Sequence, residues 1–131
     1  MEEALIARLR ADAGVAAIAD MRVFPGARPQ NSALPAIVVN RISGGPLYAD
    51  DGEVGLEQGR IQVDCWAETY TGAKLLARAV TASLSAFDGT VGATTFEFIE
   101  LENERDLREG GSNSADYPFR TALDFVVLAR R

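Results

Sequence analysis

Histidine is absent from this chain of 131 residues, and cysteine and tryptophan occur once each. Histidine is the side chain most often used for acid–base catalysis near neutral pH and the commonest metal ligand, so its absence removes the usual centre of such sites. A single cysteine excludes both an intrachain disulfide and a thiolate zinc cluster. No apolar run reaches the roughly 18 residues that a membrane-spanning helix requires, so no membrane span is expected.

Basic residues are outnumbered: 13 lysines and arginines stand against 19 aspartates and glutamates, which gives a net charge of −6. Affinity for nucleic acid comes largely from basic side chains that displace counterions, so tight DNA binding is not expected. The opening segment, MEEALIARLR, carries two acids and two arginines, unlike a secretory signal. Together with the single cysteine, this favours an intracellular assembly site over a secreted one, and residues 1–131 are expected to form one domain.

Two segments have the apolar period of a helix that packs on one side. The first covers residues 2–14 and is followed by a short turn over residues 15–20. The second starts after Thr69 or Thr71, either of which can cap it, and is expected to stop at Gly89. Its apolar stripe comprises Ala73, Leu76, Ala77, Val80, Leu84 and Phe87.

Strands are indicated by alternating or continuous apolar runs, with a weak strand at residues 22–24. A change of phase near Phe98 indicates a bulge that would keep Phe96, Phe98, Ile99 and Leu101 all on the core side. Two glycine-rich polar stretches, 44–58 and 107–118, are interpreted as long loops. The sequence thus predicts an α+β fold, with an antiparallel sheet of four to five strands and two helices packed on one face. The clear strands are residues 36–43, 59–66, 94–107 and 119–131.

The adjacent Cys65 and Trp66 lie in a strand of strict alternation. Cys65 continues the inward row of Ile61 and Val63, where a small side chain of apolar character is expected. A reactive thiol needs a base or cations nearby, whereas the neighbouring Asp64 disfavours the thiolate. We therefore interpret Cys65 as a core residue. Trp66 faces the other side, either covered by a packed helix or loop or serving as the anchor of a subunit contact.

Asp50, Asp51 and Glu53 form an acidic cluster that suggests calcium as one interpretation. The calcium-loop pattern places acids at alternate positions before a glycine and ends on a glutamate, a spacing that ADDGEVG lacks. A solvated acidic loop is the better interpretation. The segments 43–45 and 108–111 lack the lysine of a phosphate loop and are interpreted as turns. No catalytic, metal or cofactor site is predicted, and an enzyme is not expected.

Three longer stretches follow one another in an order that resembles a known family: FPGARPQNSALPAIVVNRISGG, then GRIQVDCWAETYTGAKLLARAVTASL, then YPFRTALDFVVLARR. Together they are similar to the tail-completion family of long-tailed phages and related gene transfer agents, whose members act as tail terminators or head–tail joining proteins. The resemblance runs through most of the chain and rests on core patterns, so it brings no catalytic residues.

The resemblance implies a ring, usually a hexamer, that is assembled in the bacterial cytoplasm and lies at the head–tail junction of the particle. The implied partners are further copies of the chain, the tail tube protein and the head connector or stopper protein. DNA would pass through the ring without being bound tightly. The residues expected at the subunit or tail interface are Leu47, Tyr48, Asp50, Asp51, Glu53, Trp66, Leu107 and Tyr117.

Two alternatives stay open at the level of sequence. The first is a small-ligand-binding or regulatory α+β domain, and the weaker second is an enzyme that uses pairs of Asp or Glu. A ring protein should expose apolar side chains at two separate edges of the subunit. A binding domain should instead enclose them in one cavity.

Overall fold

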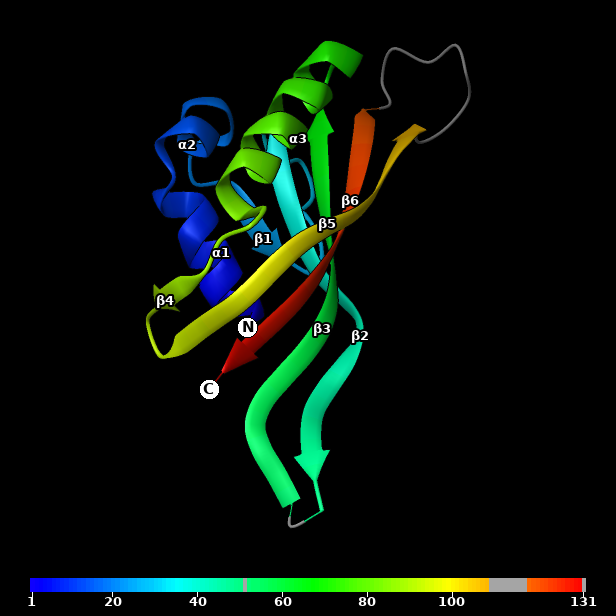
Figure 1. Ribbon diagram of the computed structural model, residues 1–131. Coiled ribbons are helices and arrows are strands. Elements are labelled where there is room, and N and C mark those ends of the chain that lie inside the picture. Colours follow the sequence, from blue (N-terminus) through cyan, green and yellow to red (C-terminus); the bar gives the residue numbers. More distant parts are fainter. Residues whose placement is uncertain (51, 109–117, 131) are drawn as a thin grey trace.

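The computed structural model describes residues 1–50, 52–108 and 118–130. At residues 53, 54 and 108 it describes the backbone but not the side chain. Within these ranges the chain forms three helices and six strands (Figure 1). The helices are α1 (Glu2–Ala11), α2 (Ala13–Ala19) and α3 (Tyr70–Leu84). The strands are β1 (Val23–Pro25), β2 (Ala36–Ala49), β3 (Gly52–Ala67), β4 (Gly89–Val91), β5 (Thr94–Arg108) and β6 (Phe119–Arg130).

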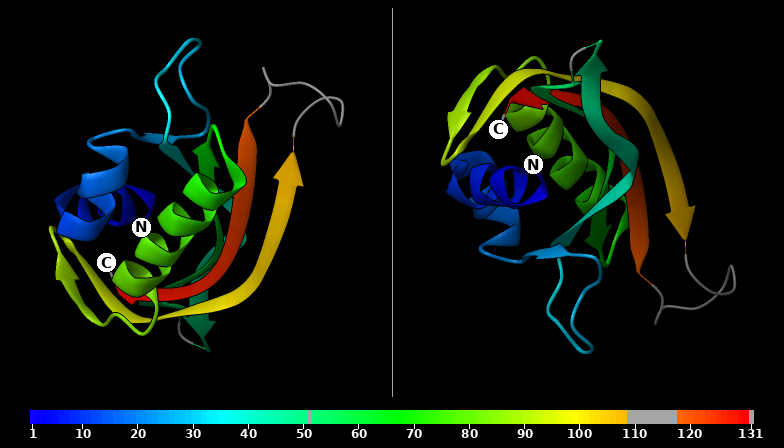
Figure 2. Two further views of the ribbon diagram at one scale, coloured as in Figure 1. Left: turned by 90° about the horizontal axis from the view of Figure 1, so that it is seen from above. Right: turned by 90° about the horizontal axis from the view of Figure 1, so that it is seen from below.

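The strands form one curled sheet in the order β1-β2-β3-β6-β5-β4. β1 runs parallel to β2, and the other neighbours pair antiparallel. The sheet curves around α3 as a half-barrel, and the helices lie on its concave side (Figure 2). The predicted antiparallel sheet of four to five strands with two helices is therefore wrong. The sheet is mixed and has six strands, and three helices pack against it.

The elements that the prediction lacked are short. β1 and β4 span three residues each, and α2 spans seven. α2 begins because a carboxylate oxygen of Asp12 accepts hydrogen bonds from the amides of Gly14 at 2.9 Å and Val15 at 3.1 Å. Asp12 itself is extended, so it separates α1 from α2. The segment predicted as one helix and a turn is therefore two helices.

The central helix, α3, buries the apolar stripe that the sequence predicts. Thr69 caps it, because its hydroxyl accepts a hydrogen bond from the amide of Gly72 at 2.9 Å. The helix ends at Leu84 and not near Gly89, because Ala86 takes a left-handed φ of 61° and turns the chain. The stripe residues that are buried are Ala73, Leu76, Ala77, Val80 and Leu84, with Phe87 partly buried beside them.

β5 contains the predicted bulge. Its register against β6 shifts between Phe96 and Phe98, so Phe96 and Ile99 both face the core and are buried. Leu101 packs against the edge of the core, whereas Phe98 is half-buried and stands outside the core cluster. The bulge is confirmed, and the expectation that it would turn Phe98 inward as well is wrong.

The stretch 44–58, which the sequence suggests is a loop, is a long β-hairpin. β2 continues to Ala49 and β3 begins at Gly52, so only two residues connect the strands. Two register shifts along β2 bend the hairpin. Glycine, proline and acidic residues lower the intrinsic strand propensity here, but pairing between the two strands satisfies their backbone groups.

Candidate assembly surfaces

The hairpin of β2 and β3 projects beyond the rest of the sheet (Figure 1). The last pair between β3 and β6 joins Leu56 to Arg130, so residues 46–55 extend past the end of β6. We call residues 46–55 the arm. Four residues on each strand, at about 3.3 Å per residue, extend it by about 13 Å. The arm is therefore placed to contact a neighbouring molecule.

Ion pairs fix the base of the arm to the body of the protein. Arg41 donates from Nε to Oε1 of Glu2 at 2.5 Å and from Nη2 to Oε1 of Glu57 at 2.7 Å. Glu2 begins α1, whereas Glu57 lies in β3 and is only 9% exposed. Gly59 also packs against Met1, because a Cβ at this glycine would lie 2.9 Å from the methionine Sδ. These contacts set the direction in which the arm leaves the sheet.

The structure gathers several predicted interface residues on the arm. Tyr48 is 71% exposed, Leu47 is half-buried, and Asp50 is exposed at the end of β2. Asp51 lies outside the described residues, and Glu53 is described only by its backbone, which pairs with Tyr48. The arm thus presents an aromatic side chain next to an acidic tip.

The start of α3 lies at the opposite end of the molecule from the arm (Figure 1), and it carries a second group of exposed apolar side chains. Tyr70 is 51% exposed and Leu75 is 49% exposed. Together with polar neighbours and Glu104 they line a shallow depression of about 260 Å³. Sequence reasoning missed this surface. The available signal was Leu75, a leucine that lies outside the predicted apolar stripe and is therefore not expected to be buried. We call it the helix patch, and it consists of Tyr70, Thr71, Lys74, Leu75 and Arg78.

The two cations of the helix patch differ in their surroundings. Nζ of Lys74 lies 2.6 Å from Oδ1 of Asp106 and 2.8 Å from Oε2 of Glu104 in β5. Hydrogen bonds to these carboxylates raise the pKa of Lys74, and the hydrogen bond from Lys74 lowers the pKa of Asp106. Arg78 is exposed and forms no hydrogen bond or ion pair with any residue that the structure describes. Arg78 is therefore the cation available to a partner.

Leu107 lies in β5 and not in a loop, because the strand continues past it. With Tyr70 and Phe119 it lines a cavity of about 160 Å³ near the helix patch. The rings of Tyr70 and Phe119 meet edge to face, with their centres 6.3 Å apart. The predicted loop at 107–118 is wrong at residues 107 and 108, which belong to β5, and Tyr117, with the rest of 109–117, lies outside the described residues.

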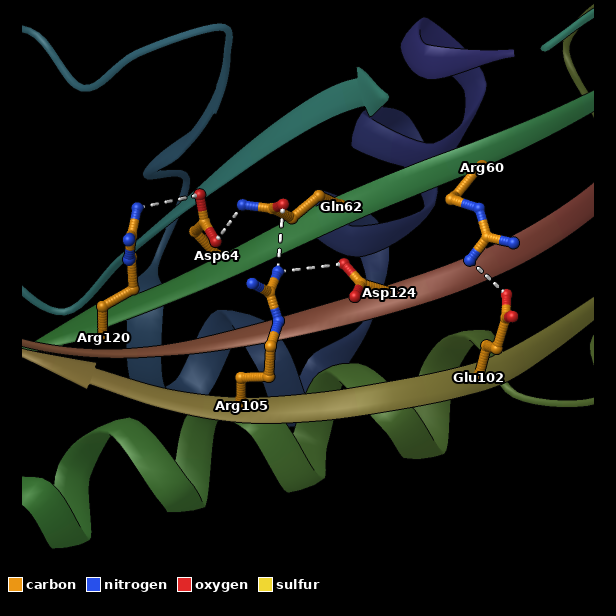
Figure 3. Close-up of polar contacts among 7 residues, drawn as sticks. All are labelled: Arg60, Gln62, Asp64, Glu102, Arg105, Arg120 and Asp124. Atoms are coloured by element: carbon orange, nitrogen blue, oxygen red, sulfur yellow. Dashed lines mark hydrogen bonds and ion pairs between the residues drawn. The ribbon is translucent and has the colours of Figure 1, made fainter. Parts of the chain in front are cut away.

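The convex face of the sheet carries polar side chains that are joined across three strands (Figure 3). Gln62 donates to Asp64 at 2.9 Å, and Nη2 of Arg105 reaches Gln62 at 3.3 Å and Asp124 at 3.5 Å. Arg120 lies 3.7 Å from Asp64. Burial raises the pKa of Asp64, although Gln62 and Arg120 favour its charged form. These groups largely satisfy one another within the chain.

Trp66 lies at the end of this face and is 8% exposed. The guanidinium carbon of Arg28, in the connection between β1 and β2, lies 4.7 Å from the ring centre, and that of Arg120 lies 5.1 Å from it. Cations held over an indole ring are favourable contacts. The interpretation of Trp66 as a side chain covered by a loop is confirmed, and its role in a subunit contact stays a prediction.

Cys65 is fully buried and belongs to the core cluster. Desolvation raises the pKa of its thiol, and the negative charge of Asp64 raises it further. Because the thiolate is the reactive form, burial of this kind makes a cysteine inert. The interpretation of Cys65 as a core residue is confirmed.

Replacing Cys65 by Ser is expected to lower the free energy of unfolding by about 1 to 3 kcal/mol, because the new hydroxyl is buried among apolar groups. Assembly should be unchanged, since the thiol contacts only the core. Urea denaturation measures the first effect, and size-exclusion chromatography measures the second. A folded Cys65→Ser variant that does not assemble would show that the thiol has a role beyond packing.

No group of three or more metal-binding side chains is placed to hold an ion in the described part of the chain. The calcium interpretation also involves Asp51 and the side chain of Glu53, which lie outside that part. Among the described helices, none has the length and apolar character needed to cross a bilayer.

Comparison with known proteins places the chain in a family. It is similar in fold to a chain from the structure described as "Virion of native gene transfer agent (GTA) particle", with a TM-score of 0.80 and 19% sequence identity. That likeness covers 100% of this chain and 95% of the other, and at this identity it shows the fold alone. No curated protein matches the sequence. The family model for "Tail completion protein gp17" matches residues 3–125, so the chain belongs to this family of phage tail completion proteins.

Proposed function

We propose that the protein forms a hexameric ring at the head–tail junction of a phage or gene transfer agent particle. The ring ends the tail tube and joins it to the head connector. Membership of the tail completion family makes the chain a structural protein of a phage tail. The observation that carries the more specific proposal is the position of the exposed apolar side chains, which supports contacts through two different surfaces.

The arm and the start of α3, which lie at opposite ends of the molecule (Figure 1), both carry exposed apolar side chains. Tyr48, on the arm, is 71% exposed, whereas Tyr70 and Leu75, in α3, are 51% and 49% exposed. Ile42, which is 53% exposed, lies outside the arm, in the part of β2 beside the body of the sheet. Met21 is a further exposed apolar residue, between α2 and β1. Head-to-tail contacts join two different surfaces and close into a ring when the rotation between subunits permits. This distribution is the one expected of a ring subunit.

A small-ligand domain is the alternative, and the hollows of the structure favour it less. The cavity beside Leu107 and the depression at the helix patch measure about 160 and 260 Å³. Ligand pockets are usually about 300 to 1,000 Å³ and mostly apolar. Three larger hollows fall within this range of volumes, at about 320, 440 and 530 Å³, but each is lined in part by charged side chains. These charged residues are Arg60 in the first, Arg8 and Asp12 in the second, and Asp88, Glu97 and Glu100 in the third. We accordingly propose a structural role without enzymatic activity.

The proposed partners follow from this position in the particle. They are further copies of the chain, the tail tube protein and a connector or stopper protein of the head. The structure that this fold resembles is that of a whole gene transfer agent virion, which supports assembly in a particle of that kind.

Negative-stain microscopy tests the proposal directly. The purified protein is imaged alone and after mixing with purified tail tubes that lack their head-proximal end. We expect rings with a central hole, free or seated at one end of each tube. A protein that stays monomeric in solution and leaves the tube ends bare would overturn the proposed function.

The protein is expected to bind double-stranded DNA weakly or not at all at physiological salt. Its net charge of −6 opposes contact with phosphate, and a conduit that held DNA would slow its passage. Fluorescence anisotropy with a labelled duplex, repeated over a series of salt concentrations, measures this. Salt-sensitive binding at sub-micromolar concentration would contradict the role of a passive conduit.

A further inference from the structure

We propose that the arm of one subunit docks on the helix patch of the next copy of the same chain. The inference rests on the proposed ring and names the two surfaces that would form its subunit contact. The arm comprises residues 46–55, and the helix patch is the exposed side of α3 around Leu75. These surfaces lie at opposite ends of the molecule (Figure 1), so the arm cannot reach the patch of its own chain.

Charge is the first reason for this pairing. The arm and its tip contain Asp50, Asp51 and Glu53 and no lysine or arginine, so the segment is acidic. The helix patch offers Arg78, which is exposed and forms no ion pair within the described residues. Lys74 is already paired with Glu104 and Asp106 of β5, so Arg78 supplies the positive charge of the patch. An acidic segment and a patch with a free guanidinium are complementary.

Apolar contact is the second reason. Tyr48 on the arm is 71% exposed, and Tyr70 and Leu75 on the patch are 51% and 49% exposed. The patch is hollowed by about 260 Å³, a volume suited to a side chain. Aromatic residues that enter such a hollow often dominate the energy of an interface. Docking would cover the exposed apolar groups of both surfaces in one contact.

Contact between two arms fits the structure less well. In a two-fold contact each surface meets its own copy, so the acidic tips of two arms would face each other. Like charges placed together in an interface oppose association. An arm that meets a patch avoids this repulsion, and a pair of subunits joined in this way keeps one free arm and one free patch. Repeated head to tail, the contact builds a ring when the rotation between subunits permits.

Charge reversal tests the contact. Asp50→Arg and Arg78→Glu are each expected to weaken association between subunits by on the order of tenfold to a hundredfold, because each puts like charges in the contact. The double variant Asp50→Arg/Arg78→Glu should recover most of the loss. The matched control is Asp88→Arg/Arg78→Glu, which reverses an exposed acid outside both surfaces and should recover nothing. Mass photometry of free protein and counting of subunits on capped tail tubes both report assembly.

Wild-type protein in the same assays separates this inference from the proposed function. If wild-type rings form and the single variants assemble normally, the arm does not dock on the patch, whatever happens to particle titre. Loss of titre alone would instead assign the arm to the tail tube or connector. Single variants that fail to assemble and are not recovered by the double variant would show that Asp50 and Arg78 do not face each other. Circular dichroism of each variant confirms that it is folded.

Discussion

Deletion of residues 48–54 is expected to abolish ring formation or tail attachment and to leave the melting temperature nearly unchanged. These residues form the end of the arm, beyond the last pair of β3 with β6. The ion pairs of Arg41 with Glu2 and Glu57 lie below the cut, so the base of the hairpin keeps its support. Size-exclusion chromatography, thermal denaturation and the titre of infectious or transducing particles measure the three outcomes.

A second variant distinguishes the effect of the length of the arm from the effect of its side chains. Replacing residues 48–54 by seven Gly and Ser residues keeps the chain length but removes Tyr48 and the acidic tip. If the side chains make the contact, this variant should fail to assemble in the same way as the deletion. Normal assembly together with a normal titre in either variant would show that the arm is only a connection between two strands.

The helical period was sufficient to predict the face that α3 buries. Leu76 and Val80 are fully buried, as the stripe requires, and Thr69 caps the helix as expected. The same reasoning placed Cys65 inside, because strict alternation fixes which side of a strand each residue faces. Both predictions depend only on the local period of apolar residues. Such periods persist in the fold because burial of these residues stabilises it.

The arm could not be predicted in the same way. Gly44, Gly45 and Pro46 interrupt the alternation of β2, and the register shifts there break the period of two. A sequence pattern records burial, and an arm that leaves the sheet buries little. The acidic tip then suggests a loop, although its two strands pair with each other. Extended hairpins of this kind are therefore recognised from the structure and not from the pattern of apolar residues in the sequence.

The sheet order was also beyond the reach of local patterns. β1 and β4 are too short to show a period, and the parallel pairing of β1 depends on the path of residues 26–35 between the strands. Gly89 looked like a helix stop because glycine accepts left-handed conformations, yet Ala86 takes that role. These features depend on tertiary contacts, and the pattern of a single sequence does not indicate which tertiary contacts form.

The helix patch was missed because an exposed leucine carries no distinctive signal. Large apolar side chains are common on protein surfaces, so Leu75 alone indicates nothing. It becomes informative once Tyr70 is seen beside it, with Arg78, which pairs with no described residue, one turn further along α3. The predicted interface residues of the arm and the unpredicted residues of the helix patch then form two surfaces of complementary character.

Leu76→Ala is expected to lower the free energy of unfolding by about 2 to 4 kcal/mol, and Val80→Ala by somewhat less. Both side chains are fully buried between α3 and the sheet, so truncation removes apolar burial and leaves a cavity. For a chain of this length the loss for Leu76 corresponds to a fall in melting temperature on the order of 10 °C. Urea denaturation followed by circular dichroism measures the free energies.

Leu75→Ala is the matched control, because it makes the same chemical change at the adjacent position of the same helix. Leu75 is 49% exposed, so its truncation should cost under about 1 kcal/mol of stability, as surface changes usually do. In the assembled ring the order should reverse: Leu75→Ala should weaken association between subunits, whereas Leu76→Ala should assemble normally at temperatures where it is folded. Equal losses of stability for the two leucine variants would show that the buried face of α3 has been assigned wrongly. Equal assembly would instead remove Leu75 from the subunit contact.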